Sequence, residues 1–241
     1  PICTINVVGV YAAGAISLSA DKLRLSGRTS AGTTLSLVGA SGLTLQADTL
    51  VESRGNQDVT LRTTAGTLLM NDGSLVQTAG AITLGSATMT GDIVLGRLQG
   101  GAGTISVTTQ GRLTDGDTGT TNGLASGPEL PNIVGTGGIQ VRADQGIGSA
   151  TDRLVIQAST VNSLNSGAGD TFVELRPTTT GSVTLENLDG RHADLLAGSG
   201  GLIVGMGDWV LSGDLRVKAA GDPTDTGKLI APGQLNLDVG V

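Results

Sequence analysis

The feature that most constrains this chain is a short phrase of alternating apolar and polar residues that returns at a fixed interval. Val59, Ile82 and Ile105 each begin such a phrase, and they are spaced 23 residues apart. Alternation over three residues is typical of a short strand with one buried face. Residues one interval apart share their character when each strand pairs with its counterpart in the next coil. The repeat therefore predicts an all-β fold, a parallel β-helix (β-solenoid).

Further apolar positions fall inside the same intervals. Leu68 and Ile93 form a second set, and Leu75 and Leu98, again 23 residues apart, form a third. We therefore expect about three short strands per coil of roughly 20–25 residues, with ten or eleven coils in all. The phrase begins at Ile16, Leu35, Leu43, Val59, Ile82, Ile105, Ile139, Val183, Leu215 and Leu235.

The composition also favours a solenoid. The 241 residues include 40 Gly but only one Phe, one Tyr and one Trp, and the net charge is -7. Glycine and β-branched residues disfavour helices, and regularly spaced Leu, Ile and Val argue against disorder. A narrow tube accepts these aliphatic side chains more easily than stacked rings. Glycines expected to supply left-handed or tight backbone at the corners are Gly66, Gly80, Gly91, Gly103 and Gly111.

Residues 1–241 are expected to form a single β-helix segment of a longer solenoid. Ile139 follows Ile105 by 34 residues, 11 more than the 23-residue coil, and this surplus predicts a loop excursion over residues 114–137. A second excursion is predicted over residues 152–169. Both ends read as uncapped strands, so we expect further coils of the same polypeptide, or end-to-end copies, to cover them.

One stretch carries a family resemblance. Residues 138–144 (GIQVRAD), 146–154 (GIGSATDRL), 161–164 (VNSL) and 169–173 (GDTFV) resemble the repeats of filamentous-haemagglutinin-type exoproteins and related large bacterial adhesins. The resemblance implies a right-handed β-helix on the outside of a Gram-negative-type cell, exported unfolded through an outer-membrane pore (two-partner secretion). The family's Asn-Pro-Asn-Gly-type secretion motif is absent from this sequence.

Few residues suggest chemistry. His192, the only histidine, lies in a polar stretch typical of a turn, and Cys3 has no other histidine as a base. Residues 221–228 (GDPTDTGK) depart from a phosphate loop in spacing and lack the following Ser or Thr. Asp115 and Asp117 begin a calcium-type loop, but glycine stands at the third ligand position. The sequence predicts no catalytic, cofactor-binding or metal-binding residues and no cofactor.

The balance of 21 Asp and Glu against 14 Lys and Arg argues against a nucleic-acid partner, and no apolar run predicts a transmembrane segment. We expect a non-enzymatic stalk or passenger segment of a secreted or cell-surface exoprotein, adhesin-like and extracellular, with a host or neighbouring-cell surface ligand as a further partner. One alternative is a filament or surface-layer subunit. Another is a polysaccharide lyase or hydrolase, which needs converging carboxylates, whereas Asp58 is followed at one-coil offsets by Ala81 and Thr104.

Overall fold

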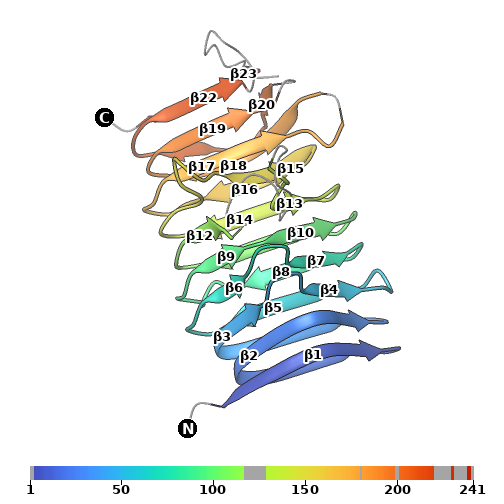
Figure 1. Ribbon diagram of the computed structural model, residues 1–241. Coiled ribbons are helices and arrows are strands. Elements are labelled where there is room, and N and C mark those ends of the chain that lie inside the picture. The colour runs from blue at the N-terminus through green and yellow to red at the C-terminus, as the bar shows by residue number, and fades with distance from the viewer. Residues whose placement is uncertain are drawn as a thin grey trace.

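The fold is a stack of coils, seen in a computed structural model that describes residues 3–116, 129–179, 181–198, 201–219, 229–230 and 238–239. Over these residues the chain is all-β, without helices, and winds into a parallel β-solenoid of about 9 turns. Successive coils follow one another in chain order along the stack, from blue to red (Figure 1). The predicted fold class is confirmed, and the described residues form about 9 turns where ten or eleven were expected of the whole chain.

The strands are short after the first three, which bend around the corners of the coil. Their bounds are β1 (Thr4–Ala12), β2 (Ile16–Ala31), β3 (Leu35–Leu45), β4 (Leu50–Ser53), β5 (Val59–Thr63), β6 (Leu68–Met70), β7 (Leu75–Thr78), β8 (Ile82–Gly85), β9 (Ile93–Leu95), β10 (Arg97–Gly100), β11 (Ile105–Thr109), β12 (Leu113–Asp115), β13 (Ile133–Val134), β14 (Ile139–Ala143), β15 (Leu154–Gln157), β16 (Thr160–Asn165), β17 (Thr171–Arg176), β18 (Val183–Gly190), β19 (Ala193–Ala197), β20 (Leu202–Val204), β21 (Trp209–Leu211), β22 (Leu215–Ala219), β23 (Leu229–Ile230) and β24 (Asp238–Val239).

Parallel pairing stacks the residues that the repeat identifies. Val59 pairs with Ile82, and Ile82 pairs with Ile105, along β5, β8 and β11. Leu68 pairs with Ile93 in the second series of strands, formed by β6 and β9. The prediction that like residues stack in parallel at one-coil intervals is therefore confirmed for both series.

The third series differs from the prediction by one residue. Leu98 pairs with Val76, and Leu75 pairs with Arg97, so Leu75 and Leu98 do not stack. Val76 is fully buried, whereas Leu75 is only half-buried. Successive side chains of a strand point to opposite sides, and β7 turns the smaller Val76 inward. The sequence prediction was wrong here because it took the larger side chain for the core residue.

One continuous hydrophobic core runs through the coils. Leu84, Ile93 and Leu98 are typical of it, because each is fully buried, and burial of such a side chain contributes about 1.5–3 kcal/mol. Trp209 is the one aromatic residue in the described core, and its indole Nε1 donates a hydrogen bond to the carbonyl oxygen of Leu185 at 3.4 Å. Aliphatic stacking therefore supplies nearly all of the apolar burial.

The corner glycines permit close backbone contact between coils. A Cβ atom on Gly91 would lie 2.3 Å from the carbonyl oxygen of Gly66, and one on Gly66 would lie 1.8 Å from that of Ser41. On Gly103 it would lie 2.3 Å from the carbonyl carbon of Gly80. None of the five glycines singled out from the sequence has a positive φ. Tight packing is confirmed as their role, and the left-handed alternative is wrong.

The ends of the excursion predicted over residues 114–137 belong to the coils. Thr114 lies in β12, and β13 pairs with both β10 and β15. Ile133 and Asn132 are fully buried. Residues 117–128, the middle of the predicted loop, lie outside the described residues.

The second predicted excursion, over residues 152–169, is wrong. Strands β15 and β16 both lie within it, and each pairs in parallel with a strand of the preceding coil and a strand of the following coil. The additional apolar residues are therefore core residues of a regular coil. They are Leu154, Ile156, Val161 and Leu164, all fully buried.

Candidate functional site

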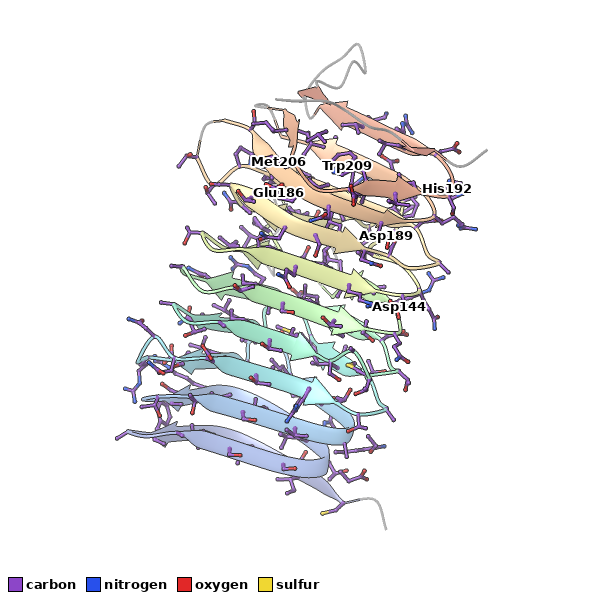
Figure 2. The ribbon with its side chains drawn as sticks, turned by 180° about the vertical axis from the view of Figure 1, so that it is seen from behind. Asp144, Glu186, Asp189, His192, Met206 and Trp209 are labelled. Atoms are coloured by element: carbon purple, nitrogen blue, oxygen red, sulfur yellow. The ribbon has the colours of Figure 1, made fainter. Side chains whose placement is uncertain are left out.

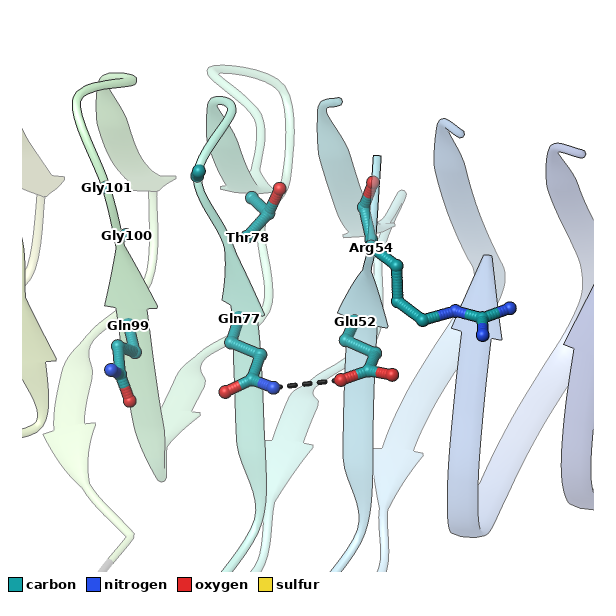
Figure 3. A pocket seen from close by; sticks show the side chains of 9 residues that line it. Glu52, Arg54, Gln77, Thr78, Gln99, Gly100 and Gly101 are labelled. Atoms are coloured by element: carbon teal, nitrogen blue, oxygen red, sulfur yellow. Dashed lines mark hydrogen bonds between the residues drawn. The ribbon is translucent and has the colours of Figure 1, made fainter. Parts of the chain in front are cut away.

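A row of polar side chains follows the outer side of the third series of strands. The register pairs Ser30 with Glu52, Glu52 with Gln77, and Gln77 with Gln99. The residue that precedes each of them in the chain is fully buried, so strand alternation turns these four to the outer side of the strands, where neighbouring residues still bury Ser30 and Glu52. We call Glu52, Gln77 and Gln99 the amide row; they come from β4, β7 and β10, three successive coils (Figure 3).

Glu52 is the most constrained member of this row, because it is only 4% exposed. Its Oε1 accepts hydrogen bonds from Arg28 Nε (3.0 Å), Arg28 Nη2 (2.6 Å) and Ser30 Oγ (2.6 Å), and its Oε2 accepts one from Gln77 Nε2 (2.9 Å; Figure 3). Burial raises the pKa of Glu52, but the hydrogen bonds from Ser30, Arg28 and Gln77 outweigh it, so the pKa lies below its ordinary value. The ionised carboxylate thus joins three coils.

A shallow groove of about 410 Å³ lies over the amide row. The groove can bind a ligand through hydrogen bonds, because Gln77 and Gln99 offer amide donors and acceptors. The carboxylate of Glu52 already accepts hydrogen bonds from its own partners. Arg54 extends away from the two glutamines (Figure 3). The lining residues are Glu52, Ser53, Arg54, Gln77, Thr78, Ala79, Gln99, Gly100 and Gly101.

An acidic cluster forms where β12 ends. One carboxylate oxygen from each of Asp115, Glu129 and Asp152 lies within 4.8 Å of the other two. Asn132 Nδ2 donates a hydrogen bond to Asp115 Oδ1 at 2.7 Å, and Asn132 Oδ1 accepts one from the backbone N of Val155 at 2.8 Å. The sequence analysis compared Asp115 and Asp117 with a calcium-type loop and predicted a turn without a metal site; Asp117 lies outside the described residues. Glu129 comes from the segment between β12 and β13 in the same coil, and Asp152 comes from the next coil, just before β15.

Burial controls the protonation of this acidic cluster. It raises the pKa of Glu129, and the charge of Asp152 adds to the effect against the opposing hydrogen bond with Asp115. Burial also raises the pKa of Asp152. Three close carboxyl groups, of which Glu129 and Asp152 have raised pKa values, can share protons or bind a cation. Glu129 and Asp152 are one 23-residue interval apart, but Asp115 lies only 14 residues before Glu129. The sequence interpretation missed this site because it followed acidic residues at one-coil offsets from Asp58 alone.

The remaining candidate residues, His192 and Cys3, lie outside the strands. His192 lies at the edge of the stack, just before β19 (Figure 2). Its Nδ1 accepts a hydrogen bond from the backbone N of Asp214 at 2.8 Å, which places the proton of a neutral ring on Nε2. Cys3 is an exposed free thiol. Residues 221–228, the stretch compared with a phosphate loop, lie outside the described residues.

Comparisons of the chain with protein-family models, with curated proteins and with solved structures find no match to any of them. A search of the described residues for a helix that is both long and apolar enough to cross a membrane finds none.

Proposed function

We propose that this chain is a structural stalk or passenger segment of a large secreted or cell-surface exoprotein, of the right-handed, adhesin-like kind. The observation that carries the proposal is the pairing pattern, in which β1 pairs with β2 and each later coil pairs in parallel with the next as far as β22. The backbone of each coil pairs only with that of its neighbours, so the length of the rod is set by the number of coils. Such a body suits the role of holding an adhesive region at a distance from a cell.

Two measurements test this proposal. Small-angle X-ray scattering of the purified chain is expected to give the profile of a rod with a narrow cross-section. Antibody raised against the chain is expected to label intact, unpermeabilised cells of the source organism. Labelling that appears only after the cells are permeabilised would overturn the surface assignment, and a compact scattering profile would overturn the stalk.

The first coil supports the partner that we propose, namely further coils or stacked copies. Among the described strands β1 pairs only with β2. Its side chains Ile5, Val8 and Tyr11 are 42%, 80% and 65% exposed. An unpaired strand edge with exposed apolar side chains readily pairs with another strand. If stacked copies cover this edge, sedimentation is expected to show concentration-dependent association, and Val8→Lys is expected to abolish it. A filament subunit would show the same association.

A second candidate function, polysaccharide cleavage, is favoured by the acidic cluster of Asp115, Glu129 and Asp152. Glycoside hydrolysis uses a pair of carboxyl groups, one of which carries a raised pKa as the proton donor, and Glu129 matches that description. Incubation of the chain with polysaccharides, followed by assay of new reducing ends, tests this function. Activity lost in Glu129→Gln would establish the enzyme and displace the stalk.

A further inference from the structure

The only Phe of the chain is not in the core. Phe172 lies in β17, between Thr171 and Val173, which are both fully buried, and alternation turns its ring to the outer surface, where it is half-buried. The residue paired with it in the next coil is Asp194, followed by Arg216 one coil further on. The outward-facing ring of Phe172 is not part of the hydrophobic core, so its role depends on the residues that surround it.

The preceding coil leaves a hollow beside this ring. The backbone N of Phe172 donates a hydrogen bond to Ile147 O at 2.8 Å, so the two coils are in direct contact there. A Cβ on Gly148 would lie 2.3 Å from the carbonyl oxygen of Phe172, and φ of Gly148 is +65°, so this position accepts only glycine. The cleft next to the ring measures about 440 Å³. Small residues that line it are Gly146, Gly148, Ser149, Ala150, Ala168 and Gly169.

Charged side chains surround the hollow. Arg191 binds Asp170 through two hydrogen bonds of 2.8 Å each, and Arg142 Nε donates to Asp144 Oδ1 at 2.8 Å. Both acids lining the cleft are therefore paired with an arginine. Arg112 also lines the cleft, and its guanidinium forms no ion pair with any residue in the described part of the chain.

A second hollow of about 290 Å³ continues from the first and shares Asp170 and Phe172 with it. It is lined by His192 and by Asp194, whose Oδ2 pairs with Arg153 Nη2 at 2.9 Å. Asp194 Oδ1 is buried and accepts no hydrogen bond from a described residue. A buried acceptor of this kind is costly unless a ligand donor or a water satisfies it.

We propose that this double cleft binds an acidic saccharide. The apolar face of a sugar ring stacks on Phe172, because aromatic surface with a few placed polar groups is the usual make-up of a small-ligand site. The sugar hydroxyls bond to the paired carboxylates and to Asp194, and the ligand's carboxylate pairs with Arg112, the cation that lacks a counter-ion. The saccharide would then bind to the side of the rod, independently of any adhesive region that the rod displays.

The test measures binding of oligogalacturonates and of neutral cello- and malto-oligosaccharides to the 241-residue chain by isothermal titration calorimetry. Oligogalacturonates are expected to bind, and the neutral sugars to bind at least about tenfold more weakly. Phe172→Ala is expected to weaken oligogalacturonate binding about tenfold or more, while Phe172→Tyr keeps it. Arg112→Gln is expected to weaken it about tenfold and to reduce its dependence on salt.

Two further variants test whether binding depends on the cleft itself. Ala168→Leu fills the hollow from an exposed position without altering Phe172, and it is expected to block binding while the melting temperature stays at the parent value. Tyr11→Ala removes an exposed ring from the first coil and is expected to leave binding unchanged. Absence of oligogalacturonate binding, equal binding of neutral sugars, or binding that survives Phe172→Ala would overturn the proposal. The scattering profile of the rod is independent of all three results, so the stalk can stand or fall separately.

Discussion

Replacement of Glu52 by Ala tests whether a buried carboxylate joins the coils. The substitution removes the acceptor of the hydroxyl of Ser30, which is itself fully buried, and of the amide of Gln77. A buried hydroxyl left without a partner costs about 1–3 kcal/mol, and the lost amide bond about 0.5–1.5 kcal/mol. Arg28 adds little, because its side chain is 47% exposed and water replaces the lost bonds. We therefore expect a loss of about 1.5–4.5 kcal/mol in the free energy of unfolding.

The pH dependence separates the charge from the packing. The pKa of Glu52 is lower in the folded chain than its ordinary value, so its stabilising contribution is complete above the ordinary pKa. That contribution is lost as the pH falls through the folded pKa. In Glu52→Gln the side chain keeps its size but cannot ionise, so the difference from the parent chain should be largest near neutral pH and shrink in acid.

Urea unfolding followed by circular dichroism is the assay, with Asp208→Asn as the matched control. Asp208 is exposed, so removal of its charge is expected to change stability by less than about 0.5 kcal/mol. A solenoid can unfold in segments, so the slope of the urea transition is compared as well as its midpoint. If Glu52→Ala is no less stable than Asp208→Asn, the reasoning about the buried carboxylate is refuted.

Three further predictions concern the core, the corners and the acidic cluster. Ile82→Ala creates a cavity in the core and should lower the free energy of unfolding by about 2–5 kcal/mol, whereas Thr83→Ala, on the outer side of the same strand, should lower it by less than about 1 kcal/mol. Equal losses in urea unfolding would contradict the inward position of Ile82. Gly91→Ala places a Cβ 2.3 Å from a carbonyl oxygen of the preceding coil and should lower the melting temperature sharply, whereas Gly14→Ala, with nothing within 4 Å of the added carbon, should not. Glu129→Gln should raise stability at neutral pH, because burial raises the pKa of Glu129 and its ionised form therefore destabilises the fold. This gain in stability should disappear as the pH falls, and a gain that persists in acid would show that the charge of Glu129 is not the cause.

The sequence alone predicted the parallel solenoid, and the reason is physical. Each strand pairs with its counterpart one coil away, so Val59, Ile82 and Ile105 occupy one environment and share one character. The environment repeats at nearly the same interval as the sequence, which makes a tertiary contact visible as a period. The inward series of aliphatic residues could thus be predicted, and alternation around Val173 and Leu175 could have placed Phe172 outside as well.

The positions at which the strand register departs from the repeat could not be predicted from the sequence. The third series steps by one residue fewer than predicted because β7 turns Val76 inward and Leu75 outward. The stretch over residues 152–169 reads as irregular, yet its strands β15 and β16 pair normally. Turn lengths vary without changing the cross-section of the coil, so spacing along the chain does not fix which residues lie opposite each other.

The candidate sites depended still more on the tertiary structure. Asp115 and Glu129 lie in one coil, and Asp152 of the next coil completes their cluster. The cleft at Phe172 exists because small residues of the preceding coil lie beside it. The apolar repeat does not mark such sites, because a repeated pattern records what every coil shares. A site on a solenoid is made by the residues in which neighbouring coils differ, and those differences acquire meaning only when the stacking places them side by side.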